Sequence, residues 1–181
     1  MTDNPGVRID EAHAHLLFGF VCAHKPSSVL EFGFGGGRSA EAILKAMAWN
    51  GNAACYTLVD NFCDWGGAMP EEARTFFLRH AEAHLVVCSE RLFVAECRAQ
   101  FDFIMSDADH TSTQLWFDDV YERLLAPGGI LVYHDVRSFP NIGEIETACQ
   151  KRNIPHVVFD KNSRREEACQ RGLLVIFKPQ E

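Results

Sequence analysis

Short, nearly continuous apolar runs alternate with helical patterns along this chain, and that alternation limits the fold more than any other feature. The runs are rich in β-branched and aromatic residues, as strands buried on both faces are. They span 28–32, 56–59, 85–87, 101–105, 130–133, 156–159 and 173–177. Amphipathic patterns between them predict helices over 11–22, 39–49, 71–80, 112–125 and 143–152. Such alternation predicts a mostly parallel sheet with helices on both faces.

The last two apolar runs have no helical pattern between them. Segment 161–167 is polar throughout and is interpreted as a solvated loop, so the final strands are expected to form an antiparallel hairpin. A chain of 181 residues buries one substantial core and fits one domain better than two. We therefore predict a single α/β domain over 1–181, with a doubly wound, mostly parallel seven-stranded sheet and a preceding N-terminal helix within 9–24.

Composition excludes several classes of protein. No apolar run approaches the about 20 residues of a membrane span, and the first residues do not resemble a secretion signal. The seven cysteines form no CxxC pair and are expected to be reduced, which favours the cytoplasm. A formal charge of −8 argues against a general binder of phosphate backbones, so no nucleic-acid partner is expected.

A glycine-rich turn follows the first predicted strand and leads into a helix. The glycines are Gly33, Gly35, Gly36 and Gly37. They permit positive φ and a close approach of a ligand to the backbone. A dinucleotide fingerprint that starts at Gly33 needs glycine at the position of Arg38, which disfavours a nicotinamide-dependent oxidoreductase. Glu31 would repel a pyrophosphate but attract an ammonium group.

The pattern Glu-x-Gly-x-Gly-x-Gly at 31–37 resembles motif I of class I S-adenosylmethionine-dependent methyltransferases. The resemblance implies a Rossmann-like methyltransferase fold and an S-adenosylmethionine site that includes Glu31 and the glycine turn. Asp60 ends the second predicted strand, where a carboxylate can accept both ribose hydroxyls. The resemblance implies the same role for Asp60 and places adenine contacts near Ser89.

Ionisable residues gather at the ends of two later strands. They are Asp107, Asp109, His110, His134 and Asp135. Because parallel strands end at the same edge of a sheet, we expect these side chains to converge on one pocket. Such a cluster can be a metal site, an acid–base pair or a capping network. Adjacent strand residues point to opposite faces, so His134 and Asp135 can both bind a metal only if the strand has ended.

Asp-Ala-Asp-His at 107–110, followed by a helix and by the segment 125–135 that ends in His-Asp, resembles the small-molecule O-methyltransferases. It is similar to the sugar and macrolide branch and to the catechol and caffeoyl-coenzyme A enzymes, over about 29–177. The resemblance implies that Asp107, beside the cofactor, binds a divalent metal, that His110 is the base, and that His134 and Asp135 complete the metal site. With His134 in place of a carboxylate, manganese is tolerated as well as magnesium.

The sequence thus predicts methyl transfer from S-adenosylmethionine to a hydroxyl oxygen of a small molecule, with His110, Asp107 and Asp135 as catalytic residues. The chain is short for this family, which implies a small or flat acceptor, or a lid from another subunit of a homo-oligomer. A non-catalytic S-adenosylmethionine-binding module, acting as a sensor or partner subunit, is the alternative. His13 lies on the apolar stripe of helix 11–22 and is interpreted as a core residue, and His15 lies on the opposite side.

Overall fold

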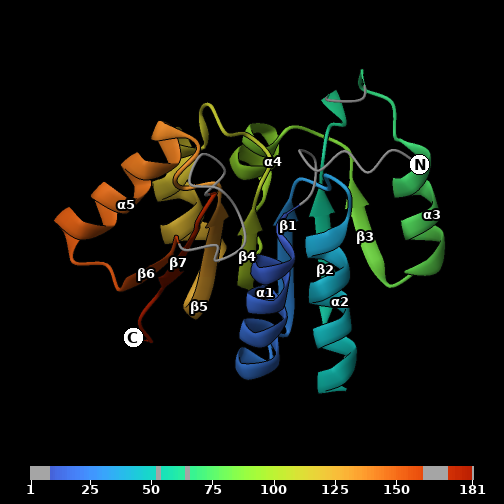
Figure 1. The fold of residues 1–181 in the computed structure, drawn as a ribbon, viewed down its shortest axis with the longest axis horizontal. Coiled ribbons are helices and arrows are strands. Elements are labelled where there is room, and N and C mark those ends of the chain that lie inside the picture. The colour runs from blue at the N-terminus through green and yellow to red at the C-terminus, as the bar shows by residue number, and fades with distance from the viewer. Residues whose placement is uncertain (1–8, 52–53, 64–65, 161–170, 181) are drawn as a thin grey trace.

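The computed structural model describes residues 9–51, 54–63, 66–160 and 171–180. Its strands form one sheet in the order β3-β2-β1-β4-β5-β7-β6 (Figure 1). The strands are β1 (Ser28–Phe32), β2 (Cys55–Val59), β3 (Ala83–Val86), β4 (Phe101–Ser106), β5 (Leu125–His134), β6 (His156–Phe159) and β7 (Leu173–Phe177). β1 to β5 pair in parallel, and β7 runs antiparallel to both β5 and β6. The predicted seven-stranded sheet and its C-terminal antiparallel pair are confirmed. The predicted loop at 161–167 lies outside the described residues.

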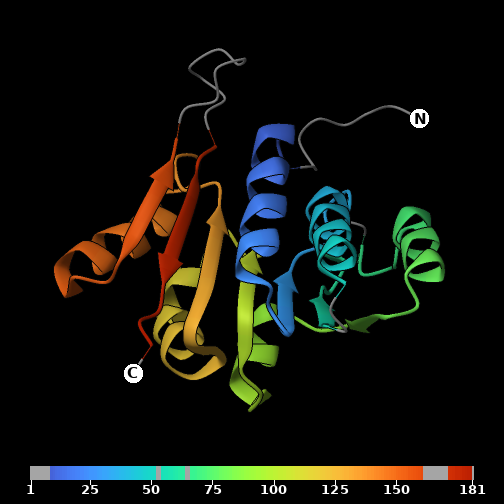
Figure 2. The same ribbon diagram turned by 90° about the horizontal axis from the view of Figure 1, so that it is seen from below.

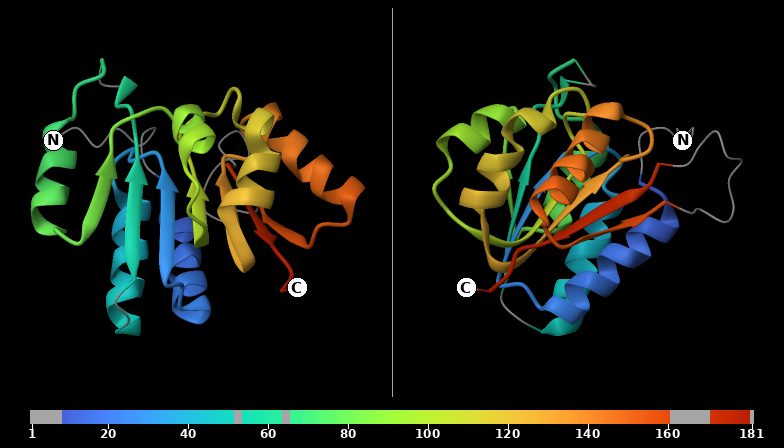
Figure 3. Two further views of the ribbon diagram at one scale, coloured as in Figure 1. Left: turned by 180° about the vertical axis from the view of Figure 1, so that it is seen from behind. Right: turned by 90° about the vertical axis from the view of Figure 1, so that its left-hand side faces the viewer.

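Helices cover both faces of the sheet. They are α1 (Glu11–His24), α2 (Arg38–Asn50), α3 (Glu71–Arg79), α4 (Glu90–Glu96), the 3₁₀ helix η2 (Thr113–Trp116), the π-helix η3 (Asp119–Leu124) and α5 (Pro140–Arg152). α1 and α2 lie on one face, and α4, η3 and α5 lie on the other (Figures 2 and 3). Of the helices that the structure describes, none is long and apolar enough to cross a membrane.

The sheet separates two hydrophobic clusters, and successive residues of a strand contribute to different ones. In β1, Val29 belongs to the cluster under α1 and α2, whereas Leu30 belongs to the cluster under α4 and α5. In β4, Met105 and Ile104 divide in the same way. Because both faces are buried, each central strand is apolar at nearly every position, which explains the continuous runs in the sequence.

The predicted helix over 112–125 is wrong in detail: the segment forms the short, tight η2 and the wide turns of η3. Ser112, at the N-cap of η2, makes no capping hydrogen bond with its side chain, and its Oγ donates to Asp109 Oδ2 at 2.8 Å. Buried Glu90 instead accepts hydrogen bonds from Trp116 Nε1 at 2.9 Å and from Thr113 Oγ1 at 3.0 Å. These contacts hold η2 against the start of α4, a helix that the sequence patterns did not predict.

The turn after β1 packs directly against the end of β4. Asp107 N–H donates to Phe32 O at 2.9 Å, and Gly33 N–H donates to Val59 O at 2.9 Å. Gly33 has a φ of 92°, and a Cβ atom there would lie 2.5 Å from the carbonyl oxygen of Asp107. This position therefore requires glycine for both its conformation and its space.

We expect Gly33→Ala to destabilise the fold by about 2 to 4 kcal/mol, because it adds backbone strain and a steric clash. Gly19→Ala is the matched control, since Gly19 lies in α1 with nothing within 4 Å of an added Cβ. That change should stabilise by about 0.5 to 1 kcal/mol. Urea unfolding of both variants measures the difference, and equal stabilities would contradict the close approach at Gly33.

Candidate active site

The glycine turn joins β1 to α2 through backbone conformations with positive φ. Gly35 has a φ of 50° and Gly37, the N-cap of α2, has a φ of 73°. A Cβ at Gly37 would lie 2.8 Å from the ring of Phe34, whose carbonyl accepts the Gly37 N–H at 2.7 Å. The turn is thus compact. It leads directly into the first N–H groups of α2, which have no partner within the helix.

Glu31 lies beneath this turn, with no exposed surface. Its Oε1 accepts a hydrogen bond from Ser39 Oγ at 2.5 Å, and its Oε2 accepts one from Tyr56 Oη at 2.6 Å. Burial raises the pKa of Glu31 to about 7, against the opposing effect of these two hydrogen bonds. In this conformation Glu31 joins β1, β2 and α2, so its predicted contact with an ammonium group stays a prediction.

Asp60 lies beside the turn at the end of β2. Its Oδ2 accepts the N–H of Phe34 at 2.7 Å, and its Oδ1 accepts the N–H of Phe62 at 2.6 Å. Each carboxylate oxygen keeps a second lone pair, so these bonds do not prevent contact with a ribose.

Ser89 caps α4: its exposed side chain accepts the N–H of Leu92 at 3.3 Å. The predicted contact of Ser89 with adenine stays a prediction.

The predicted cluster at the ends of β4 and β5 forms. Asp107 Oδ1 lies 3.0 Å from His110 Nε2 and 3.2 Å from His134 Nδ1. Asp135 adds its Oδ2 at 3.4 Å from His110 Nε2. β5 ends at His134, and Asp135 has a φ of 63°, so the chain turns and both side chains reach the same space.

Asp109 was expected in this cluster, and that expectation is wrong. Its Oδ1 accepts the N–H groups of Thr111 at 2.9 Å and Ser112 at 3.0 Å. An Asp side chain that binds the backbone two and three residues ahead stabilises a turn. Asp109 therefore shapes the loop after β4.

The cluster strongly perturbs its own ionisation. Burial alone would lower the pKa of His110, but hydrogen bonds and charge from Asp107 and Asp135 raise it to about 10. Burial would raise the pKa of Asp107, yet the charges and hydrogen bonds of His134 and His110 hold it far below its usual value. The ring of His110 also stacks on Phe139, with centroids 4.5 Å apart. With no further ligand, His110 is an imidazolium at neutral pH.

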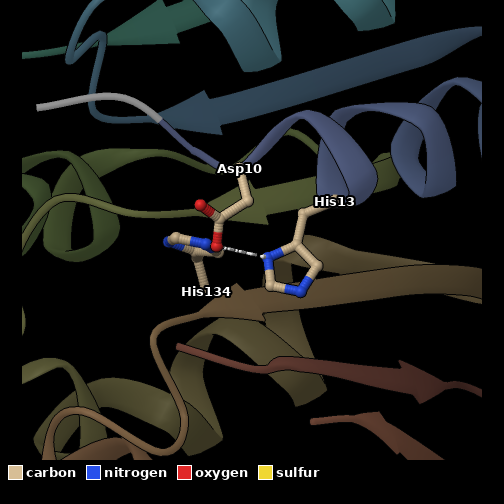
Figure 4. A group of neighbouring side chains, drawn as sticks. All are labelled: Asp10, His13 and His134. Atoms are coloured by element: carbon tan, nitrogen blue, oxygen red, sulfur yellow. Dashed lines mark hydrogen bonds and ion pairs between the residues drawn. The ribbon is translucent and has the colours of Figure 1, made fainter. Parts of the chain in front are cut away.

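His13 extends the cluster, a contact that the sequence did not predict. Its Nδ1 lies 3.1 Å from His134 Nε2, and the two rings meet edge to face with centroids 5.2 Å apart. Asp10, at the start of α1, lies beside both rings (Figure 4). The apolar stripe of the helix correctly indicated that His13 is buried, but not which strand it faces.

Residues 30–136, more than half of the chain, match a family model described as a methyltransferase domain. The chain belongs to this methyltransferase family. The match confirms the family and the enzyme class that the motifs at 31–37 and 107–110 predicted. No curated protein sequence matches the chain.

Solved structures share the fold of this methyltransferase at low sequence identity. The O-methyltransferase TomG from Streptomyces achromogenes, in complex with S-adenosylmethionine, has a TM-score of 0.73 and 14% identity, over 98% of this chain and 84% of that chain. The S-adenosylhomocysteine-bound PaMTH1 of Podospora anserina has a TM-score of 0.74 and 12% identity, over 99% and 82%. An O-methyltransferase from Bacillus cereus gives 0.67 and 15%, over 96% and 84%. At these identities the likeness shows the fold.

The raised pKa of Glu31 makes the stability of this methyltransferase depend on pH. A carboxyl whose pKa is about 7 when folded and 4.5 ordinarily binds a proton on folding, so it disfavours folding increasingly from about pH 4.5 to 7. The cost above pH 7 is about 3 kcal/mol. We expect Glu31→Gln to remove it, so that wild-type stability falls relative to the variant as pH rises through this window.

Urea unfolding at a series of pH values measures this difference. Glu41→Gln is the control, because Glu41 is an exposed carboxylate on α2 and its loss should leave the pH profile nearly unchanged. Parallel profiles for the wild type and Glu31→Gln would show that ionisation of Glu31 does not lower the free energy of unfolding.

Proposed function

We propose that this protein transfers a methyl group from S-adenosylmethionine to a hydroxyl oxygen of a small molecule. One observation carries the proposal: the glycine turn after β1 and the cluster around Asp107 are in direct backbone contact, through Asp107 N–H and Phe32 O at 2.9 Å. A methyl donor in the turn would thus lie next to ionisable groups that can handle a proton. Membership of the methyltransferase family supports the reaction, and the ligands named for TomG and PaMTH1 support the donor.

We assign the donor to the carboxyl ends of β1 and β2. Gly33, Gly35 and Gly37 bring the backbone close to it, and Asp60 accepts its ribose hydroxyls. Glu31 fixes the turn from beneath and adds negative charge on the side of the ammonium group. Asp107 borders the donor from β4, and Ser89 is retained as a candidate adenine contact.

In the proposed reaction the acceptor oxygen forms a bond to the methyl carbon while the carbon–sulfur bond breaks and its electron pair returns to sulfur. The hydroxyl proton goes to His110 Nε2, the ring nitrogen that faces Asp107 and Asp135. His110 accepts this proton only in its neutral form, and the two carboxylates now hold it protonated. A cation bound by the carboxylates of Asp107 and Asp135 would lower the pKa of His110. We therefore expect the role of His110 as a base to depend on what those carboxylates bind.

A group that shares Asp107 and Asp135 with this proton acceptor fits a divalent metal. Asp107, His134 and Asp135 each offer a ligand atom, and these atoms lie within 4.8 Å of one another. Among the described atoms, buried Asp135 Oδ1 has no hydrogen-bond partner, although Arg171 Nε lies 3.7 Å away. Two carboxylates and one imidazole suit Mn²⁺, and Mg²⁺ less well. A metal held here would supply a Lewis acid for the acceptor oxygen.

Calorimetry with S-adenosylmethionine and S-adenosylhomocysteine, followed by a turnover assay on a panel of hydroxylated small molecules, tests the proposal. We expect saturable binding of both ligands and methylation of an acceptor. Turnover should fall after EDTA treatment and return with Mn²⁺ or Mg²⁺ if the metal assists. Binding without turnover on any acceptor would favour the non-catalytic module instead, and no binding of either ligand would refute both.

His110→Ala should lower kcat by about 100-fold or more, because it removes the general base, while the Kd for S-adenosylmethionine changes little. Calorimetry measures the Kd, and an assay at saturating donor measures kcat. The control is His84→Ala, at an exposed position of β3. Equal losses of kcat and donor affinity would show that His110 supports donor binding rather than proton transfer.

A further inference from the structure

A second group of metal-ligating side chains lies on the other side of His134. Asp10, His13 and His134 each present one ligand atom, and the three atoms lie within 4.8 Å of one another. The Nδ1 of His13 is 3.1 Å from His134 Nε2 and 3.8 Å from Asp10 Oδ2. Figure 4 shows the carboxylate of Asp10 beside the two imidazole rings. All three residues are buried, with at most 4% of their surface exposed.

The fold brings this group together from two distant segments. Asp10 is the N-cap of α1 and His13 lies one turn further on, so both side chains fall on the same face of the helix. Asp10 makes no capping hydrogen bond with its side chain, and the carboxylate instead turns toward His13. His134 is the last residue of β5 and has no exposed surface. The start of α1 therefore lies over the carboxyl end of the sheet.

We propose that Asp10, His13 Nδ1 and His134 Nε2 form a binding site for a borderline divalent cation such as Zn²⁺. Zn–N bonds of about 2.0 to 2.1 Å at tetrahedral angles place two ligand nitrogens about 3.3 Å apart. The observed 3.1 Å between the imidazole nitrogens needs only a small adjustment. Three protein ligands leave the fourth position to water, and two imidazoles with one carboxylate favour Zn²⁺ or Co²⁺ over Mg²⁺.

The surroundings of His134 match this use of its Nε2. Its Nδ1 lies 3.2 Å from Asp107 Oδ1 and 3.4 Å from Asp135 Oδ1. A histidine that binds a metal through one nitrogen commonly donates the other N–H to a carboxylate, which fixes the ring and increases its basicity. Asp107 supplies that carboxylate, so the outer contact of the proposed site is already in place.

The proposed site is distinct from the oxygen-rich group of Asp107, His134 Nδ1 and Asp135. A neutral imidazole has one lone pair available to a metal, because its other nitrogen carries the proton. A cation on Nε2 therefore removes His134 from the set that faces Asp107. The two groups thus compete for His134, and the nitrogen-rich one does not depend on methyl transfer.

Full-length protein without an affinity tag, stripped of metal by a chelator, is titrated with Zn²⁺ in a calorimeter and with Co²⁺ in an absorption spectrometer. We expect one-to-one binding of Zn²⁺ and a ligand-field absorption of Co²⁺ typical of low coordination number. His13→Ala should weaken Zn²⁺ binding by at least about 100-fold, because loss of an outer contact alone costs 10- to 100-fold. His15→Ala, an exposed histidine on the same helix, is the matched control and should bind as the wild type does.

Asp135→Asn separates the two groups, since Asn tolerates the positive φ at this position and Asp135 belongs only to the oxygen-rich group. This variant should keep its Zn²⁺ affinity within about tenfold. If His13→Ala does not fold, as judged by circular dichroism, Asp10→Asn takes its place with the same expected loss. Absence of Zn²⁺ binding by the wild type, unchanged binding by the α1 variants, or loss of binding only in Asp135→Asn would each overturn the proposal. None of these results bears on donor binding, which calorimetry with S-adenosylmethionine tests separately.

Discussion

The packing of the turn after β1 against the end of β4 is the constraint on which the candidate site depends. Gly33 lets the carbonyl of Asp107 approach to a distance that any side chain would prevent. Two backbone hydrogen bonds, from Gly33 to Val59 and from Asp107 to Phe32, then hold the ends of β2, β1 and β4 together. The spacing between the glycine turn, Asp60 and Asp107 is therefore fixed by main-chain atoms. Donor and acceptor groups built on such an edge need little further ordering before reaction.

Sequence patterns predicted the sheet well because its strands are buried on both faces. β1, β6 and β7 have the predicted bounds, and only β5 begins much earlier than expected, since Leu125 already pairs with Phe101. Four of the five polar residues expected to converge at the ends of β4 and β5 do so, because parallel strands end at one edge of a sheet; Asp109 is the exception. The adjacent residues His134 and Asp135 face one space only because Asp135 takes a positive φ, a conformation that its sequence position did not reveal.

Long-range contacts between polar side chains account for what the sequence did not show. His13 contacts His134, which lies 121 positions away in the sequence. An apolar stripe on a helix predicts which side chains are buried but not which residues they contact. Glu90, next to the predicted adenine contact Ser89, is a buried acceptor that holds η2. The carboxylate of Asp109 binds turn amides, whereas that of Asp107, two residues earlier, contacts His110 and His134. The residue type alone does not distinguish these roles. The fold determines whether a polar side chain contacts a ligand, a turn or another side chain.

His134 connects α1 to the candidate active site through a single ring. Its Nδ1 faces Asp107 and its Nε2 faces His13, so the proton on one nitrogen determines what the other offers. Burial disfavours the charged form of His134, but the charge and hydrogen bond of Asp107, together with the charge of Asp135, outweigh burial and raise its pKa. Burial and the charge of the neighbouring His134 lower the pKa of His13 to about 4. The carboxylate of Asp107 and the start of α1 therefore contact opposite nitrogens of one buried ring, and His134 is a direct link between them.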